Sequence, residues 1–175
     1  MKAGIGASLV ISLIAAEAQA EGVHLAERPD HVTEATAVID APAAQIYELV
    51  TSYARWPSVF SDVSSAKVEG GGRDDARVTF RSRALQHEVT VKFANEPGHA
   101  VRFRGVDGPP GGRASGEYVM TPIDGGRRTR VVARLYMDVV GMPGLFIRDS
   151  TIRYMRQAKL RADLTDLAAR FASPS

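Results

Sequence analysis

Histidines are the first side chains to consider for chemistry, because the chain has four of them and no cysteine. His24, His31, His87 and His99 are widely separated, and neither an HExxH pattern nor a carboxylate at metal-ligand spacing accompanies them. The lack of cysteine excludes disulfides, thiolate metal sites and a cysteine nucleophile. The sequence also contains no GxSxG elbow and no glycine-rich phosphate loop. We therefore expect no metal, no cofactor and no recognisable catalytic set.

His87 is the histidine most suited to a role in a pocket. It stands two and four positions before Val89 and Val91, so a strand through all three would turn them to the same face. An imidazole at that place could act as an acid or base, or contact a ligand. The alternative is a position at the strand end or rim with ordinary hydrogen bonds.

Charged residues near the start of the last predicted helix could contact the polar head of a ligand. They are Asp149, Arg153 and Arg156. Pockets for apolar molecules combine an apolar lining with a few polar groups that fix orientation. Asp149 and Arg153 could instead form an i,i+4 pair on the helix surface. Both interpretations stay open.

Large apolar side chains occupy most positions that we expect to face the interior. Such side chains usually form the core, and some would line a pocket if the fold leaves one. The candidates for the pocket, with His87 and Arg156 as polar members, are Trp56, Phe60, Phe80, His87, Val89, Val91, Phe103, Tyr118, Met120, Leu135, Met137, Phe146, Ile152, Met155 and Arg156.

Strands with alternating apolar and polar residues must position most of these side chains. The first begins near Val32, and six more follow between Val63 and Val139. The clearest is the last, in which Val131, Ala133 and Leu135 alternate with polar residues. Together they predict a curved seven-stranded antiparallel sheet with one apolar face.

Helices are expected at two places. Pro42 predicts the start of a short helix, and Pro57 limits a second short helix that follows it. The stretch 145–171 contains neither glycine nor proline and places Leu160 and Leu164 on one face, which predicts a single long helix. One helix is too slender to fill the concavity of seven strands, so we expect a cavity or a core of bulky side chains between them.

The composition describes a soluble globular domain. Hydrophobic residues make up 45% of the chain, charged residues 24%, and the formal net charge is only +2. This charge is too small for a dedicated nucleic-acid-binding domain. Several arginines fall on the expected outer face of the sheet, where they could meet anionic lipid headgroups in a peripheral membrane contact or form a solvated mixed-charge surface. We expect a monomer.

The first twenty residues resemble an export signal. Lys2 precedes an almost wholly apolar run over 3–16, and Ala18-Gln19-Ala20 is a small-x-small triplet. This pattern predicts cleavage after Ala20 and an exported protein, periplasmic or secreted. An uncleaved anchor and a buried N-terminal helix are the alternatives. Residues 21–31 are polar and are interpreted as a linker, which places the folded domain at 32–173.

Three segments carry a resemblance to a known family. VIDAPAAQIYELVTSYARWPSVFSDV, residues 38–63, is similar to the opening of START-like (SRPBCC) proteins of the polyketide cyclase, dehydrase and lipid-transport superfamily, especially its coenzyme Q-binding branch. GEYVMTPIDGGRRTRVVARLYMDV, residues 116–139, resembles the penultimate hairpin, and residues 141–171 resemble the closing helix. The resemblance implies an α+β helix-grip (START/Bet v 1-like) fold with an apolar pocket between sheet and helix.

Three functions follow as hypotheses. The first is binding or transport of a hydrophobic small molecule or lipid in that cavity, without catalysis. The second is an enzyme of the cyclase or aromatase type, which would use His87, Tyr118 or Arg156 for proton transfer. The third is a protein-interaction module whose cavity is filled.

Overall fold

The computed structural model describes residues 22–83, 87–141 and 147–172. Their order of a strand, short helices, further strands and a closing helix is the predicted order, preceded by one additional strand. The elements are β1 (His24–Arg28), β2 (Val32–Ile39), α1 (Ala43–Thr51), η1 (Tyr53–Arg55), α2 (Trp56–Val59), β3 (Val63–Gly70), β4 (Arg77–Ser82), β5 (Glu88–Phe93), β6 (Ala100–Asp107), β7 (Gly112–Ile123), η2 (Asp124–Gly126), β8 (Arg128–Val139) and α3 (Asp149–Phe171).

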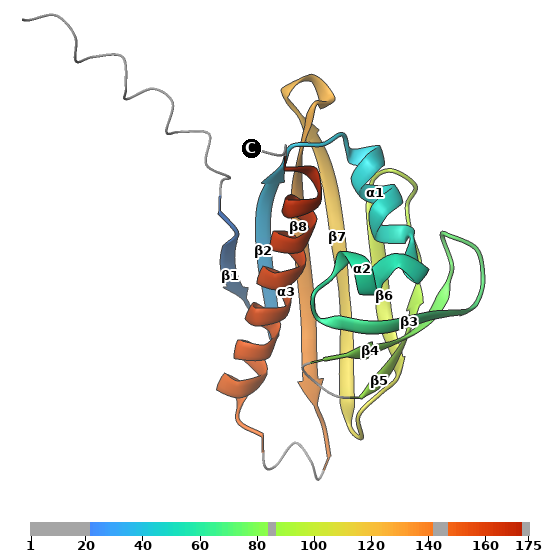
Figure 1. Cartoon of the computed structure of the whole chain (residues 1–175). Coiled ribbons are helices and arrows are strands. Elements are labelled where there is room, and N and C mark those ends of the chain that lie inside the picture. Colours follow the sequence, from blue (N-terminus) through green and yellow to red (C-terminus); the bar gives the residue numbers. More distant parts are fainter. Residues whose placement is uncertain (1–21, 84–86, 142–146, 173–175) are drawn as a thin grey trace, which may run out of the picture.

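The strands form one antiparallel sheet in the order β1-β2-β8-β7-β6-β5-β4-β3. β7 and β8 pair along their whole length, with Met120 opposite Val131 and Ala114 opposite Met137. Irregular register in the β3–β4 and β5–β6 pairs marks bulges, which bend a sheet. Figure 1 shows the consequence: β3, β4 and β5 turn away from the direction of β7 and β8, so that the sheet curves around the helices.

β1 corrects the prediction for residues 21–31. The segment that we expected to be a linker contains a strand, which pairs with β2 from His24 opposite Thr36 to Arg28 opposite Val32 and brings the sheet to eight strands. A three-residue turn joins the two strands, and Asp30 in it adopts a positive φ of 64°. Asp is among the non-glycine residues that tolerate this conformation best.

The two short helices cover neighbouring parts of the sheet: α1 packs against β6 and β7, and α2 packs against β3 (Figure 1). Pro42 caps the N-terminus of α1, as predicted, and Ile46 and Val50 point from that helix into the core. Trp56 begins α2 and donates a hydrogen bond from Nε1 to the Val50 carbonyl over 2.8 Å. The two short helices are thereby fixed to each other and to the core.

α3 is the predicted long helix, although it begins at Asp149 rather than near residue 145. Leu160, Leu164 and Leu167 are buried along one face, which lies against β2 and β8 (Figure 1). A curved antiparallel sheet held against one long C-terminal helix is the α+β helix-grip arrangement that the sequence led us to expect.

Candidate functional site

The inner face of the sheet is fully buried at one end and only partly buried at the other. Met120 on β7 and Val131 on β8 are fully buried, whereas Tyr118 and Met137 farther along the same strands are half-buried. A face under a tightly packed helix would be buried throughout, so the half-buried part borders accessible space. We call this part the trough. Its described walls are Phe80, Val89, Phe103, Tyr118 and Met137, which pack against the core. Half-buried Met155 on α3 is assigned to the same wall.

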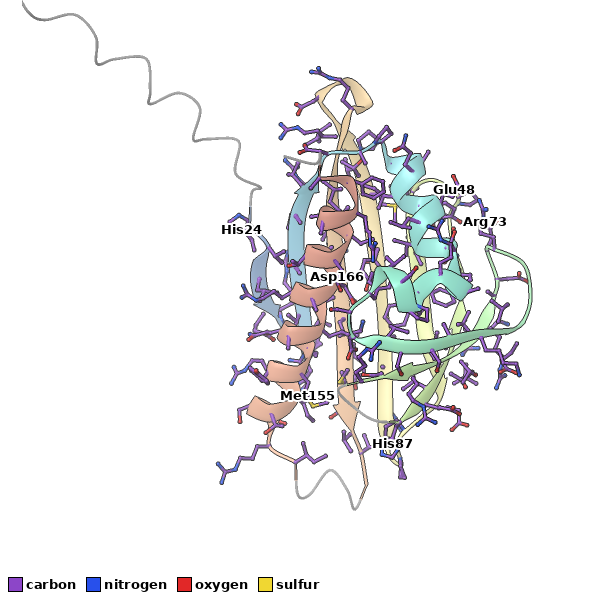
Figure 2. The ribbon with its side chains drawn as sticks, viewed as in Figure 1. His24, Glu48, Arg73, His87, Met155 and Asp166 are labelled. Atoms are coloured by element: carbon purple, nitrogen blue, oxygen red, sulfur yellow. The ribbon has the colours of Figure 1, made fainter. Side chains whose placement is uncertain are left out.

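α3 provides one wall of the trough. Ile152 and Leu160 are buried against the sheet, while Met155 and Lys159 lie elsewhere around the helix and are half-buried. The Lys159 ammonium lies 5.7 Å from the centre of the Phe60 ring, which belongs to the neighbouring end of α2. Figure 2 shows Met155 on the lower part of α3. The side of the helix that carries these two residues therefore faces the trough.

A polar cluster closes the deep end of the trough. The Tyr118 hydroxyl donates a hydrogen bond to Asp163 Oδ2 over 2.6 Å, and Lys159 Nζ donates one to Asp163 Oδ1, also over 2.6 Å. Asp163 is 1% exposed. Burial raises the pKa of Tyr118 well above its ordinary value, and the adjacent Asp163 carboxylate adds to this rise because it opposes a second negative charge.

The cluster extends to Asp62, in the turn before β3, and to Ser82 on β4. Lys159 Nζ lies 3.9 Å from Asp62 Oδ2, and Ser82 Oγ donates to the two oxygens of Asp62 over 3.1 and 3.0 Å. The cluster thus joins α3, β7, β4 and the turn before β3. The carboxylates of Asp62 and Asp163 and the ammonium of Lys159 therefore lie beside the largely apolar walls of the trough.

Arg156 is buried, but protein groups already engage it. Its guanidinium donates to Thr33 Oγ1 at 2.9 Å, to the Met137 carbonyl at 3.2 Å and to Glu27 Oε2 at 3.1 Å. Thr33 and Gln157 donate to the other oxygen of Glu27. Glu27 belongs to β1, the strand that we did not predict. Arg156 therefore fixes β1 to α3, and its three engaged nitrogens leave little for a ligand.

The remaining predicted residues divide into core and rim. Trp56 and Phe60 belong to an aromatic cluster beside the trough, where the Trp56 ring meets those of Tyr53, Phe60, Phe80 and Phe93 at 5.5 to 5.7 Å between centroids. The predicted residues that are fully buried in the core, rather than half-buried in the trough, are Val91, Met120, Leu135 and Ile152.

His87 does not face the interior, contrary to the orientation that we extrapolated from Val89 and Val91. β5 begins at Glu88, so the alternation of faces does not extend to His87, which is exposed at the lower end of the sheet (Figure 2). The strand-end interpretation of this residue is therefore correct. Arg153 is exposed as well, as is Asp149. Phe146 lies outside the described residues.

Sequence reasoning missed the polar cluster. Asp163 carried the signal that could have revealed it, because it falls between Leu160 and Leu164 on the apolar face of the last helix. A carboxylate at such a position must find a partner inside the protein. Its partner Tyr118 was assigned to the pocket, but nothing in the sequence indicated that the two residues would meet.

Within residues 22–83, 87–141 and 147–172, no three His, Asp or Glu side chains gather in a way that could hold a metal ion.

Two surface hollows bordered by described residues lie outside the trough. One, of about 310 Å³, lies between η1 and the β3–β4 turn, and the other, of about 420 Å³, lies beside η2. Half-buried apolar side chains mark the trough. None of the described helices is long and apolar enough to cross a membrane.

Solved structures resemble the fold closely. A START superfamily protein from Mycobacterium smegmatis matches with a TM-score of 0.70 and 13% identity, covering 81% of this chain and 97% of that one. The Zhui aromatase/cyclase from a Streptomyces species matches with a TM-score of 0.66 and 19% identity over 84% of this chain and 93% of its own. A protein from Thermus thermophilus matches with a TM-score of 0.67 and 21% identity over 80% of this chain and 96% of its own. At such identities the likeness establishes the fold alone.

A comparison with curated proteins gave no match. The family model described as "Polyketide cyclase / dehydrase and lipid transport" matches residues 30–172, which include β2, the trough and the whole of α3. On this match, the chain belongs to the polyketide cyclase/dehydrase and lipid-transport family.

Proposed function

We propose that the chain binds an apolar small molecule or lipid in the trough between the sheet and α3. The observation that carries this proposal is the half-burial of Phe103 and Met137, which pack against the core on the inner face of the sheet, beside half-buried Met155 on α3. Apolar surface left accessible to water in a concave place is the usual sign of a binding site. The family membership supports the proposal, since the fold suits the binding of hydrophobic ligands.

Burial of apolar surface would supply the affinity. Each square ångström removed from water contributes about 25 cal/mol, so a guest that buries about 300 Å² gains roughly 7.5 kcal/mol before the cost of association. The opening segment resembles the coenzyme Q-binding branch, which adds quinones to the candidate ligands. We also propose that the chain acts as a monomer and is exported after cleavage following Ala20, which N-terminal sequencing of the mature protein would test.

A pair of substitutions on adjacent residues of β7 tests the proposal. Ala114 lies opposite Met137 on the inner face, and its neighbour Ser115 must therefore point to the outer face. Ala114→Phe should fill the trough and weaken the binding of a neutral apolar dye such as N-phenyl-1-naphthylamine at least tenfold. Ser115→Phe adds comparable bulk outside and should leave the affinity unchanged. Thermal unfolding of both variants checks that they fold.

Equal affinity of the two variants would contradict the proposed location. If the unmodified protein binds neither the dye nor other apolar molecules, that result would support the hypothesis of a protein-interaction module whose cavity is filled.

An enzyme of the cyclase or aromatase type is the second candidate. The observation that favours it is the Tyr118 hydroxyl, hydrogen-bonded to Asp163 at the deep end of the trough. Of the three residues considered for proton transfer, His87 is exposed and Arg156 is engaged by Glu27, so Tyr118 is left. The test is turnover of a poly-β-ketone substrate by the unmodified protein and by Tyr118→Phe. Loss of turnover in the variant would support this function, and turnover that survives the substitution would count against it.

A further inference from the structure

The deep end of the trough has a chemistry unlike that of its walls. Tyr118 stands where full burial ends, one inward position beyond Met120 on the same strand. The walls toward the opposite end are Phe103, Val89 and Met137, all apolar. A guest that enters the trough therefore meets an apolar passage first and the Tyr118–Asp163–Lys159 cluster last.

The hydrogen bonds within the cluster determine what it can still accept and donate. Tyr118 gives its only proton to Asp163, so its oxygen keeps lone pairs that can accept a further hydrogen bond. Lys159 has three N–H groups and gives one to Asp163. These two residues bind the two oxygens of one carboxylate, so they lie side by side. The Tyr118 oxygen and the Lys159 ammonium thus offer one hydrogen-bond acceptor and one donor close to each other.

The formal charges oppose an anion at this place. The carboxylates of Asp163 and Asp62 lie 2.6 and 3.9 Å from the Lys159 ammonium, so two anionic groups border this place. Arg156, the buried cation nearest along the helix, is neutralised by Glu27 on β1. Because charges interact strongly where water is scarce, a carboxylate beside Tyr118 would be repelled, whereas an uncharged group would not.

We propose that the trough selects apolar molecules whose polar end is a neutral hydroxyl, held between Tyr118 and Lys159, and that it discriminates against the corresponding carboxylates. A hydroxyl fits because it can donate to the tyrosine oxygen and accept from the ammonium at once. This inference rests on the proposed function, and it names the class of ligand.

Two compounds with the same saturated chain test the inference, 1-dodecanol and dodecanoate. Each is titrated as a competitor of the neutral dye N-phenyl-1-naphthylamine on the unmodified protein at about pH 8, where a free carboxyl group is ionised. We expect the alcohol to bind at least tenfold more tightly. Equal or tighter binding of dodecanoate would overturn the inference while leaving the proposed function intact. Binding of neither compound would instead refute the proposed function.

Asp163→Asn provides the second test. The amide oxygen can still accept the Tyr118 proton, while the amide N–H₂ can no longer accept from Lys159. Because one negative charge is removed, the preference for the alcohol should shrink at least threefold. Glu48→Gln is the matched control, because Glu48 is exposed on α1 (Figure 2) and the substitution changes the net charge by the same amount. A preference that stays unchanged in Asp163→Asn, or shrinks equally in Glu48→Gln, would refute the role of the cluster. If Asp163→Asn fails to fold, the comparison in the unmodified protein still decides.

Discussion

Glu27 should stabilise the fold although it lies on an edge strand. Its carboxylate is the anionic partner of Arg156, which is 3% exposed, and it also accepts hydrogen bonds from Thr33 and Gln157. Glu27→Gln keeps the shape of the side chain but removes the charge. It also turns an amide N–H₂ toward groups that are donors themselves. The buried guanidinium then loses its counterion.

The size of the effect follows from the burial of the pair. Removal of one partner from a buried ion pair costs about 3 to 5 kcal/mol, but the side chain of Glu27 is 30% exposed, so water compensates in part. We therefore expect a loss of about 2 kcal/mol in the free energy of unfolding. For a domain of roughly 150 residues, this corresponds to a fall of about 4 to 8 °C in Tm.

A double-mutant cycle with Arg156→Met isolates this interaction. Without the guanidinium, Glu27→Gln should cost less than about 0.5 kcal/mol, because no buried charge is left without a partner. Chemical denaturation of the four proteins measures the coupling, and Glu48→Gln serves as a surface control. The same cost of Glu27→Gln in both backgrounds would refute the assigned role of β1.

The pH dependence of stability gives a separate check on Glu27. Burial raises the pKa of Glu27, but the hydrogen bonds from Gln157, Thr33 and Arg156 outweigh burial, and the pKa lies below its ordinary value of 4.5. Because the pKa is lower in the folded state, the stabilisation is present above pH 4.5 and is lost as the pH falls through the folded-state pKa. The difference between the unmodified protein and Glu27→Gln should therefore disappear in acid.

Three further predictions concern the trough and its surroundings. Gly116→Ala should destabilise the fold by about 1 to 3 kcal/mol in chemical denaturation, because the added Cβ would lie 2.7 Å from the ring of Phe103 and closer still to the Arg134 carbonyl oxygen. Trp56→Phe should cost about 1 to 3 kcal/mol, since the buried Val50 carbonyl loses its donor; a change under about 0.5 kcal/mol would contradict this. In an ultraviolet titration, Tyr53 should ionise only near pH 12, because burial raises the pKa of Tyr53 to about 12; as its folded-state pKa is the higher one, its stabilisation is lost as the pH rises toward that value.

The sequence predicted the sheet well where strands are long and half-buried. In β8, Val131, Ala133 and Leu135 are buried in alternation, as the period of two required. β1 was not predicted, because an edge strand with one half-buried residue, Leu25, shows no such alternation. Its pairing with β2 also depends on a turn with unusual backbone angles. Local sequence carries little information about either property.

The inward placement of the apolar side chains in the candidate site was predictable, but the contact at its polar end was not. Phe103, Met137 and Met155 followed from patterning, because side chains of this type at inward positions are placed by the fold itself. The Tyr118–Asp163 contact joins residues 45 positions apart on a strand and a helix, and only their packing decides whether they meet. The predicted inward orientation of His87 was wrong because we extended the alternation of faces one residue beyond the start of β5, which begins at Glu88.

The methionine methyl groups offer the most direct test of the central claim, that a guest lies between the sheet and α3. Met137 and Met155 border the trough, whereas Met120 is fully buried beyond Tyr118. In protein with ¹³C-labelled methionine methyls, titration with 1-dodecanol should shift the resonances of Met137 and Met155 along one binding curve and move that of Met120 much less. Saturable binding without any shift of Met137 and Met155 would show that the guest lies elsewhere and would contradict the account.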